Sequence, residues 1–180
     1  ANLNAYGVST DDFMLTSNLS STIVNNWVGQ IDFDLKEELL LPAFLQETGK
    51  FIISEIINDQ NKLKEFKQAI IDKGIEAAEQ EFTGFNCSRI TANIFKHWKL
   101  SHNLIFAIGF VGDIKDCPQE YKQKVQILEV VKILCNIQDP LGDKAVETAL
   151  AKAVEYNLDI ESLVSTVDSL KAKIAAGEEE

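Results

Sequence analysis

Hydrophobic residues recur along this chain every three or four positions, which is the period of one face of an α-helix. The stretch 61–71 is the plainest case, because Leu63, Phe66 and Ile70 fall on one side and lysines fall on the other. The stretch 119–136 repeats this pattern over a longer run. No segment alternates apolar and polar residues as a half-buried β-strand does. The pattern therefore predicts an all-α fold, a compact bundle of about eight or nine helices.

Short polar residues mark the predicted helix starts. Their side chains accept hydrogen bonds from the free N–H groups of the first turn. We expect helices to begin at Ser9, Asp34, Asn86, Ser101 and Asp159. Pro42 lies inside the helix predicted after Asp34, where a proline removes one backbone donor and should bend or split the helix.

The chain has 180 residues, of which 46% are hydrophobic, enough for one well-formed core. A turn signal at Asp139-Pro140-Leu141-Gly142 divides the pattern. We expect residues 1–140 to form the main helical domain. Residues 141–180 then add a pair of helices packed on it, followed by a solvated acidic tail at residues 178–180.

The formal net charge of −11 disfavours binding to nucleic acid or to an anionic membrane surface. Three cysteines at wide spacing form no Cys-x-x-Cys pair, which favours reduced, buried thiols over a zinc site. The chain shows no leader pattern and no apolar run of the roughly 18 residues that a membrane helix needs. These features predict a cytoplasmic protein.

One stretch carries a candidate chemical motif. Residues 43–50 read Ala-Phe-Leu-Gln-Glu-Thr-Gly-Lys, an apolar step that leads into two polar residues and then Thr48-Gly49-Lys50. This stretch is similar to the Gly-Leu-Leu-His-Asp-Ile-Gly-Lys signature of HD-type metal phosphohydrolases, in which the His-Asp pair holds the metal. In this chain, Gln46 and Glu47 occupy the place of that pair.

Three further blocks strengthen the likeness. Tyr6-Gly7 with Phe13 is like the segment that leads into the first HD helix, and residues 81–87 are like Glu-x-x-x-Gly-x-Asp-His. Residues 94–101 and the apolar positions after them are like Leu-x-x-x-Trp-x-Leu-Pro followed by Ile-x-x-Ala-Ile. From about residue 6 to residue 138 the chain resembles the HDOD domain family, the HD-related output domains of bacterial signalling proteins. The resemblance covers the C-terminal, HD-like part of that family, and we expect the family's N-terminal helical part to be missing from this chain.

The resemblance also places the metal ligands of HD enzymes on this sequence. Metal-dependent phosphohydrolysis needs ligands that converge on one point and leave a water open for attack. The matching positions are Thr16, Gln46, Glu47, Cys87 and Val111. None of them is a histidine, although Glu47 can still ligate a hard cation and Cys87 a soft one. His97 and His102 fall at other positions and are more typical of a surface or an interface.

The resemblance thus implies a scaffold without its metal chemistry. The favoured hypothesis is a non-catalytic signalling domain, without metal or cofactor, that binds protein partners or a small ligand in a bacterial pathway such as motility, stress or virulence control. Phe44, Phe51 and Trp98 are interpreted first as packing residues, and a ligand pocket that they line near the lost metal site is the alternative interpretation. Two alternatives stay open. One is a degenerate HD phosphohydrolase or nucleotide-binding domain that uses Glu47 or Cys87, and the other is a purely structural module that docks through residues 144–176.

Overall fold

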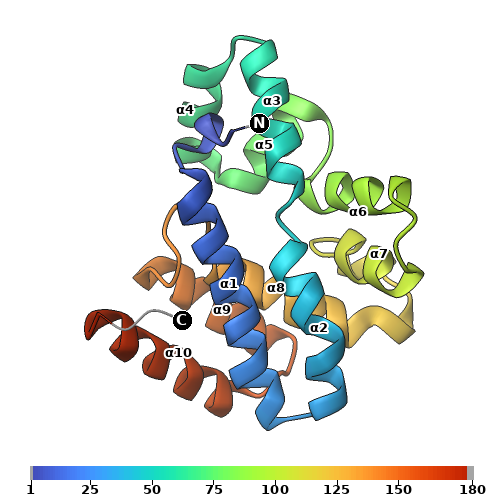
Figure 1. Ribbon diagram of the computed structural model, residues 1–180, viewed down its shortest axis with the longest axis vertical. Helices are drawn as coiled ribbons and strands as arrows, with labels where there is room; N and C mark the ends of the chain where they lie inside the picture. The colour runs from blue at the N-terminus through green and yellow to red at the C-terminus, as the bar shows by residue number, and fades with distance from the viewer. Residues whose placement is uncertain (1, 178–180) are drawn as a thin grey trace.

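The computed structural model describes residues 2–177, and this part of the chain is helical without a β-strand (Figure 1). The all-α prediction is confirmed, and the ten α-helices of the described part are close to the eight or nine predicted. The α-helices are α1 Thr10–Trp27, α2 Phe33–Leu45, α3 Gly49–Asp59, α4 Leu63–Lys73, α5 Ile75–Thr83, α6 Cys87–His97, α7 His102–Gly109, α8 Lys122–Leu134, α9 Asp143–Glu155 and α10 Ile160–Ala175. Four short 3-10 helices connect them: η1 Asn4–Tyr6, η2 Val28–Gln30, η3 Ile114–Asp116 and η4 Gln119–Tyr121.

Most of the predicted caps are confirmed. The side chains of Ser9, Asn86, Ser101 and Asp159 each accept a backbone N–H from the first turn of the helix that follows. The prediction for α2 is wrong by two residues. The side chain of Asp32, not that of Asp34, accepts a hydrogen bond from the backbone N–H of Leu35. Asp34 lies in the first helical turn, where its negative charge is stabilised by the positive end of the helix dipole.

Pro42 does not split α2, which continues through it to Leu45. The proline lies in the last turn of the helix, so its missing N–H removes only one of the final hydrogen bonds. The carbonyl oxygen of Leu40 accepts a hydrogen bond from the Ser21 hydroxyl at 2.9 Å, which ties this end of α2 to α1.

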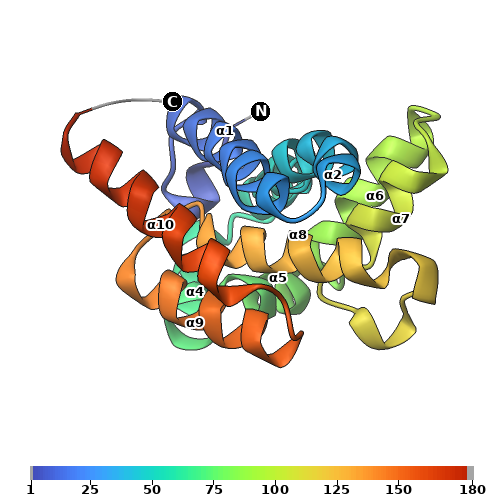
Figure 2. The same ribbon diagram turned by 90° about the horizontal axis from the view of Figure 1, so that it is seen from below.

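The larger hydrophobic core is built around α8. Figure 2 shows α8 lying between the α1–α2 pair on one side and α9 on the other. Val125, Leu128 and Val131 of α8 are fully buried, as is Trp27 at the end of α1. The C-terminal pair contributes to the same core, for example through Ala153 of α9 and Leu163 and Leu170 of α10. The acidic tail predicted at residues 178–180 lies outside the described residues.

A second core lies in the upper part of the molecule in Figure 1, where η1 packs against α3, α4 and α5. Phe66 of α4 is at its centre, with edge-to-face contacts to Tyr6 and Phe82 at ring-centroid separations of 5.5 Å. A third, smaller cluster of Phe95, Leu104 and Ile108 holds α6 against α7 as a hairpin. Within residues 2–177, no helix combines the length and the apolar character needed to cross a membrane.

Candidate functional site

The turn between α2 and α3 carries Gln46 and Glu47, the positions predicted to replace the His-Asp pair. Directly after it, Gly49 opens α3 against the start of α6. Its backbone N–H donates to the Thr91 hydroxyl at 2.9 Å, and a Cβ built on Gly49 would stand 2.8 Å from the carbonyl oxygen of Cys87. Glycine therefore permits α3 and α6 to meet at backbone distance. This contact brings the turn of Glu47 next to Cys87, whose Sγ lies 3.8 Å from the Glu47 carboxylate.

Lys50, the second residue of α3, forms a buried ion pair. Its Nζ lies 2.8 Å from Oε2 of Glu79 on α5, and these side chains are 1% and 0% exposed. The same Glu79 oxygen accepts a hydrogen bond of 2.6 Å from the hydroxyl of Tyr6. The Lys50 ammonium also lies 3.5 Å from Glu47 Oε1. The N-terminal η1, α3 and α5 are thus joined by one buried charged network.

A second ammonium reaches the same carboxylate from the larger core. Nζ of Lys132 on α8 lies 3.6 Å from Glu47 Oε1 and 3.5 Å from Glu76 of α5, and it donates to the Ser88 hydroxyl at 3.4 Å. The Glu47 carboxylate therefore stands between two lysine ammonium groups, those of Lys50 and Lys132. These three residues also line a cavity of about 370 Å³, which extends to Asn136 and Lys144.

The environment fixes the protonation of the network. Burial raises the pKa of Glu47, but the ammonium groups of Lys50 and Lys132 outweigh it, so the pKa of Glu47 falls below its ordinary value. Burial lowers the pKa of Lys50, yet nearby Cys87 and the carboxylates of Glu47 and Glu79 raise it well above the usual range. The carboxylates of Glu47 and Glu76 likewise outweigh burial and raise the pKa of Lys132. At neutral pH, Glu47 is an anion and both lysines are cations.

Cys87 differs, because burial raises the pKa of its thiol to about 12. The thiolate, not the thiol, is the form that binds metals and attacks electrophiles. At neutral pH, Cys87 therefore stays a protonated, buried thiol. Burial also raises the pKa of the Tyr6 hydroxyl, so this group stays a hydrogen-bond donor to Glu79.

The side chains at the predicted ligand positions do not fit a metal ion. Gln46 uses its Nε2 to donate to the carbonyl of Leu128 at 3.2 Å, Glu47 is occupied by two ammonium groups, and Cys87 is a thiol. Among residues 2–177, no three His, Cys, Asp or Glu side chains are grouped so that they could hold a metal ion.

The structure brings together three of the five predicted positions and leaves two apart. Gln46, Glu47 and Cys87 meet around Thr91, whose hydroxyl donates toward the carbonyls of Gln46 and Cys87 at 3.2 and 2.9 Å. Val111 is buried as part of the larger core. No hydrogen bond or ion pair joins Thr16 or Val111 to the other three positions within residues 2–177.

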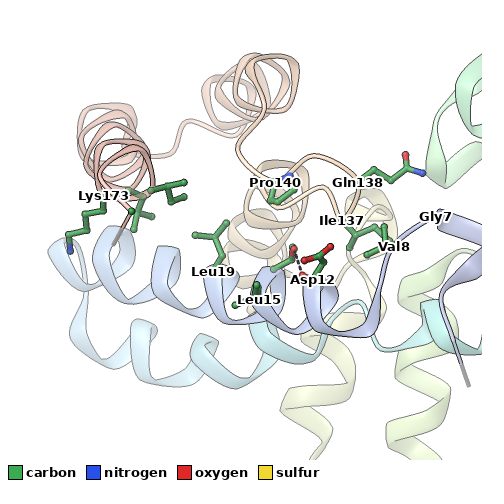
Figure 3. A pocket seen from close by; sticks show the side chains of 13 residues that line it. Gly7, Val8, Asp12, Leu15, Leu19, Ile137, Gln138, Pro140 and Lys173 are labelled. Atoms are coloured by element: carbon green, nitrogen blue, oxygen red, sulfur yellow. Dashed lines mark hydrogen bonds between the residues drawn. The ribbon is translucent and has the colours of Figure 1, made fainter. Parts of the chain in front are cut away.

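Thr16 is the other position that lies apart. It is nearly buried on α1, where its hydroxyl donates to the carbonyl of Asp12 at 2.9 Å. It lines a separate cavity of about 430 Å³ between α1, α10 and the segment 137–140, whose apolar wall includes Leu15, Leu19 and Pro140 (Figure 3).

The aromatic residues of the alternative ligand pocket have other neighbours. Phe51 packs edge to face on Phe13, with ring centroids 4.9 Å apart. Trp98 is 60% exposed and lies beside Phe95. Neither the cavity at Glu47 nor the one at Thr16 is lined by Phe44, Phe51 or Trp98.

The sequence patterns missed three members of the charged network: Tyr6, Glu79 and Lys132. A weak signal existed for Lys132, a lone charge in the apolar run Val130-Val131-Lys132-Ile133-Leu134. Buried charges are paired as a rule, so such a lysine implies a buried carboxylate nearby. Glu79 gave no comparable signal, because α5 carries other acids that face solvent.

The low pKa of Glu47 predicts a pH-dependent contribution to stability. An acid whose pKa is lower in the folded state stabilises the fold above its unfolded pKa of about 4.3, and this contribution is lost as the pH falls through the folded value. We expect Glu47→Gln to lower the free energy of unfolding by about 1–2 kcal/mol at pH 7. The difference between variant and wild type should shrink below about pH 4. Urea unfolding followed by circular dichroism across this range measures it.

Glu55→Gln, on the exposed face of α3 and beyond its first turn, is the matched control for this experiment. It removes a carboxylate that forms no ion pair within residues 2–177, and it should follow the wild-type profile. A constant difference between Glu47→Gln and wild type from neutral to acid pH would contradict the assignment of this contribution to Glu47.

Comparison with known proteins identifies the family of this chain. A model of the HDOD domain matches residues 2–114, more than half of the chain. The crystal structure of a virulence factor (cj0248) from Campylobacter jejuni subsp. jejuni has the same fold, with a TM-score of 0.74 at 24% sequence identity. The match covers 92% of this chain and 64% of that one, so this chain spans under two thirds of the virulence factor. A search of curated proteins found no match. By the family model, this chain belongs to the HDOD domain family.

Proposed function

We propose that this protein is a non-catalytic regulatory domain that acts in signal transduction by binding a protein partner. The observation that carries the proposal is the position of the Glu47 carboxylate between the ammonium groups of Lys50 and Lys132, at 3.5 and 3.6 Å. Glu47 is the one acidic residue at the positions where the HD enzymes carry their metal ligands. Its negative charge is already neutralised by two groups that belong to the protein itself.

The two ammonium groups also oppose the binding of a divalent cation. A metal ion at Glu47 would be repelled by both lysines, and buried like charges repel strongly because water screens them little. Because the pKa values of Lys50 and Lys132 are raised, both lysines keep their positive charge near neutral pH and continue to repel a metal ion. An ammonium group cannot supply the open coordination position from which a metal-bound water attacks a phosphate. The site therefore favours a scaffold role over hydrolysis.

We expect the purified protein to contain substoichiometric metal and to show no phosphodiesterase turnover. The reason is the state of the two side chains that could ligate a metal. The Glu47 carboxylate is paired with both Lys50 and Lys132, and the Cys87 thiol is protonated. Elemental analysis measures the metal content, and hydrolysis of bis(p-nitrophenyl) phosphate with added Mn²⁺, Mg²⁺, Ni²⁺ or Zn²⁺ measures turnover.

The double variant Glu47→Ala/Cys87→Ala serves as the control for adventitious metal and contaminating activity. Metal or turnover that is equal in this variant and in the wild type does not come from the site. One equivalent of metal that supports turnover in the wild type, and is lost in the variant, would overturn the proposal.

A second candidate function is recognition of a small anionic ligand such as a nucleotide. It is favoured by the cavity of about 370 Å³, which is lined by Lys144 and Asn136 as well as by the paired charges of the network. Lys144 forms no ion pair within residues 2–177, so its ammonium group is available to an anion. A ligand that binds the folded state raises the melting temperature by mass action. A thermal-shift screen with nucleotides, with and without divalent cations, separates the two functions. The proposal above expects a flat screen, and a shift that is lost in Lys144→Ala supports the ligand.

A further inference from the structure

Charge is unevenly distributed along this acidic chain. Residues 82–112 contain no Asp or Glu, yet they carry Arg89, Lys96, Lys99 and both histidines of the chain. The other residues carry all 28 acids and 14 of the 17 basic residues. This acid-free stretch forms the α6–α7 hairpin, which lies at one side of the molecule, away from α4 and α10 (Figure 1). The hairpin is therefore a basic projection from an acidic body.

The same hairpin exposes large apolar side chains. Trp98, in the connection between the helices, is 60% exposed, and Leu100 and Phe106 are each 37% exposed. Phe85, just before α6, is also exposed. A single exposed apolar residue is ordinary, but several on one supersecondary unit are typical of an interaction surface.

One face of α7 and the residue after the helix carry a stack of aromatic rings, called here the aromatic ladder. The rings of His102, Phe106 and Phe110, spaced four residues apart, stack with centroid separations of 6.1 Å and interplanar angles of 20° and 14°. Tyr121 stacks on Phe106 at 5.4 Å, and the Arg89 guanidinium lies 5.8 Å from the centre of the Phe110 ring. The rings hold one another in place, so the ladder is a rigid platform with little side-chain entropy left to lose on binding.

The cations at the tip of the hairpin are available for a partner. Arg89 pairs with Asp113 at 3.4 Å, whereas Lys96 and Lys99 are exposed and pair with no carboxylate within residues 2–177. Lys99 adopts a left-handed backbone conformation, with φ of 59°, in the tight connection between α6 and α7. Two lysines without an ion pair within residues 2–177 therefore lie on either side of Trp98 in the sequence, at the connection between α6 and α7.

We propose that the α6–α7 hairpin is the docking surface for an acidic amphipathic segment of a partner protein. In such a segment, apolar side chains pack on the exposed Trp98 and Leu100 while carboxylates meet Lys96 and Lys99. This inference rests on the proposed function and names the chemistry of its partner. Buried aromatic anchors ringed by charges are the residues that dominate binding energy at protein interfaces.

Charge and ring geometry favour an acidic protein over a nucleic acid. Nucleic-acid binding depends on many cations that neutralise successive phosphates. The stretch 82–112 has only three Lys and Arg residues, and the whole chain has a net charge of −11. Base recognition also needs free ring faces, whereas the faces of His102, Phe106 and Phe110 are turned toward one another. Phe106 is still 37% exposed, and aliphatic or aromatic side chains pack well against the exposed part of such a ring.

The test uses the full chain and an amphipathic helical peptide built of Glu, Leu and Phe. Trp98 reports binding by fluorescence, because Trp27 is fully buried and stays in its own environment. We expect the peptide to shift and shield Trp98 emission, and Lys96→Glu/Lys99→Glu to weaken binding about tenfold. The matched control is Lys62→Glu/Lys64→Glu, which makes the same charge change on exposed residues around the start of α4. Both variants should melt like wild type.

The peptide with Lys in place of Glu and a single-stranded oligonucleotide are run in parallel. Binding of the acidic peptide alone, weakened only by Lys96→Glu/Lys99→Glu, supports the surface. No peptide binding, equal weakening in the control variant, or tighter binding of the oligonucleotide overturns it. Self-association that Lys96→Glu/Lys99→Glu abolishes also overturns it, since the occupant is then a second copy. None of these readouts depends on metal or hydrolysis, so failure here is distinct from failure of the proposed function.

Discussion

Lys50→Met is expected to lower the free energy of unfolding by about 3–5 kcal/mol, the cost of leaving a buried charge without its partner. Methionine matches the length of lysine, so the packing around position 50 is largely kept while the ammonium is lost. Glu79, which is 0% exposed, then keeps only the Tyr6 hydroxyl at 2.6 Å as a donor to its Oε2. Its other oxygen, Oε1, has no hydrogen-bond partner among residues 2–177 even in the native protein. Urea unfolding followed by circular dichroism measures the loss.

The triple variant Tyr6→Phe/Lys50→Met/Glu79→Leu is the informative control for Lys50→Met. Replacing a whole buried ionic group by apolar residues of similar volume is often neutral, because the desolvation cost disappears together with the attraction. We expect the triple variant to be more stable than Lys50→Met by about 2 kcal/mol or more. If Lys50→Met costs about as little as an exposed ion pair, under about 1 kcal/mol, the network does not hold a buried charge.

Gly49→Ala is expected to destabilise the protein by about 1–3 kcal/mol, the range for an added methyl group in a tightly packed site. The new Cβ would lie 2.8 Å from the carbonyl oxygen of Cys87 and 3.1 Å from the backbone nitrogen of Thr91. Both are backbone atoms of α6, so relief requires α3 and α6 to move apart. That movement also lengthens the hydrogen bond from Gly49 to the Thr91 hydroxyl. Thermal and urea unfolding of the variant test this result.

Gly29→Ala is the matched control for the contact at Gly49. There the nearest atom to an added Cβ is the flexible Lys36 Cδ at 3.3 Å, which can move aside. We expect its stability to stay within about 0.5 kcal/mol of wild type, as for most surface substitutions. Equal losses for the two variants would mean that loss of glycine in general, rather than the approach of α3 to α6, sets the cost.

The sequence predicts the helices well because both signals behind them are local. The apolar spacing of 3.6 and the polar cap both lie within one or two turns of the residues they describe. The error at α2 has the same origin. Asp32 and Asp34 are two acids near one helix start, and only the extended backbone of Asp32, with φ of −156° and ψ of 110°, makes it the cap. Sequence alone does not separate a cap from a first-turn acid.

The site was predictable only in part, because its members come from distant segments. Gln46, Glu47 and Cys87 were recognised through motif positions and do lie together. The motif likeness gave Lys50 no partner, whereas the structure pairs it with the buried Glu79. Trp98 was predicted to pack inside the fold or, alternatively, to line a pocket, yet it is 60% exposed in the connection between α6 and α7. Pairings of this kind depend on tertiary contacts that no local pattern encodes.

The contacts of Tyr6 also bear on the order in which the chain assembles. Its hydroxyl reaches Glu79, 73 positions away, and its carbonyl accepts a hydrogen bond from Gln138, 132 positions away. Closing such long loops costs chain entropy before the contacts repay it, so pairings this distant slow folding. Tyr6 therefore reaches its native environment only after η1, α5 and the segment after α8 have come together. The environment of this one tyrosine ring is a natural marker for the last stage of folding.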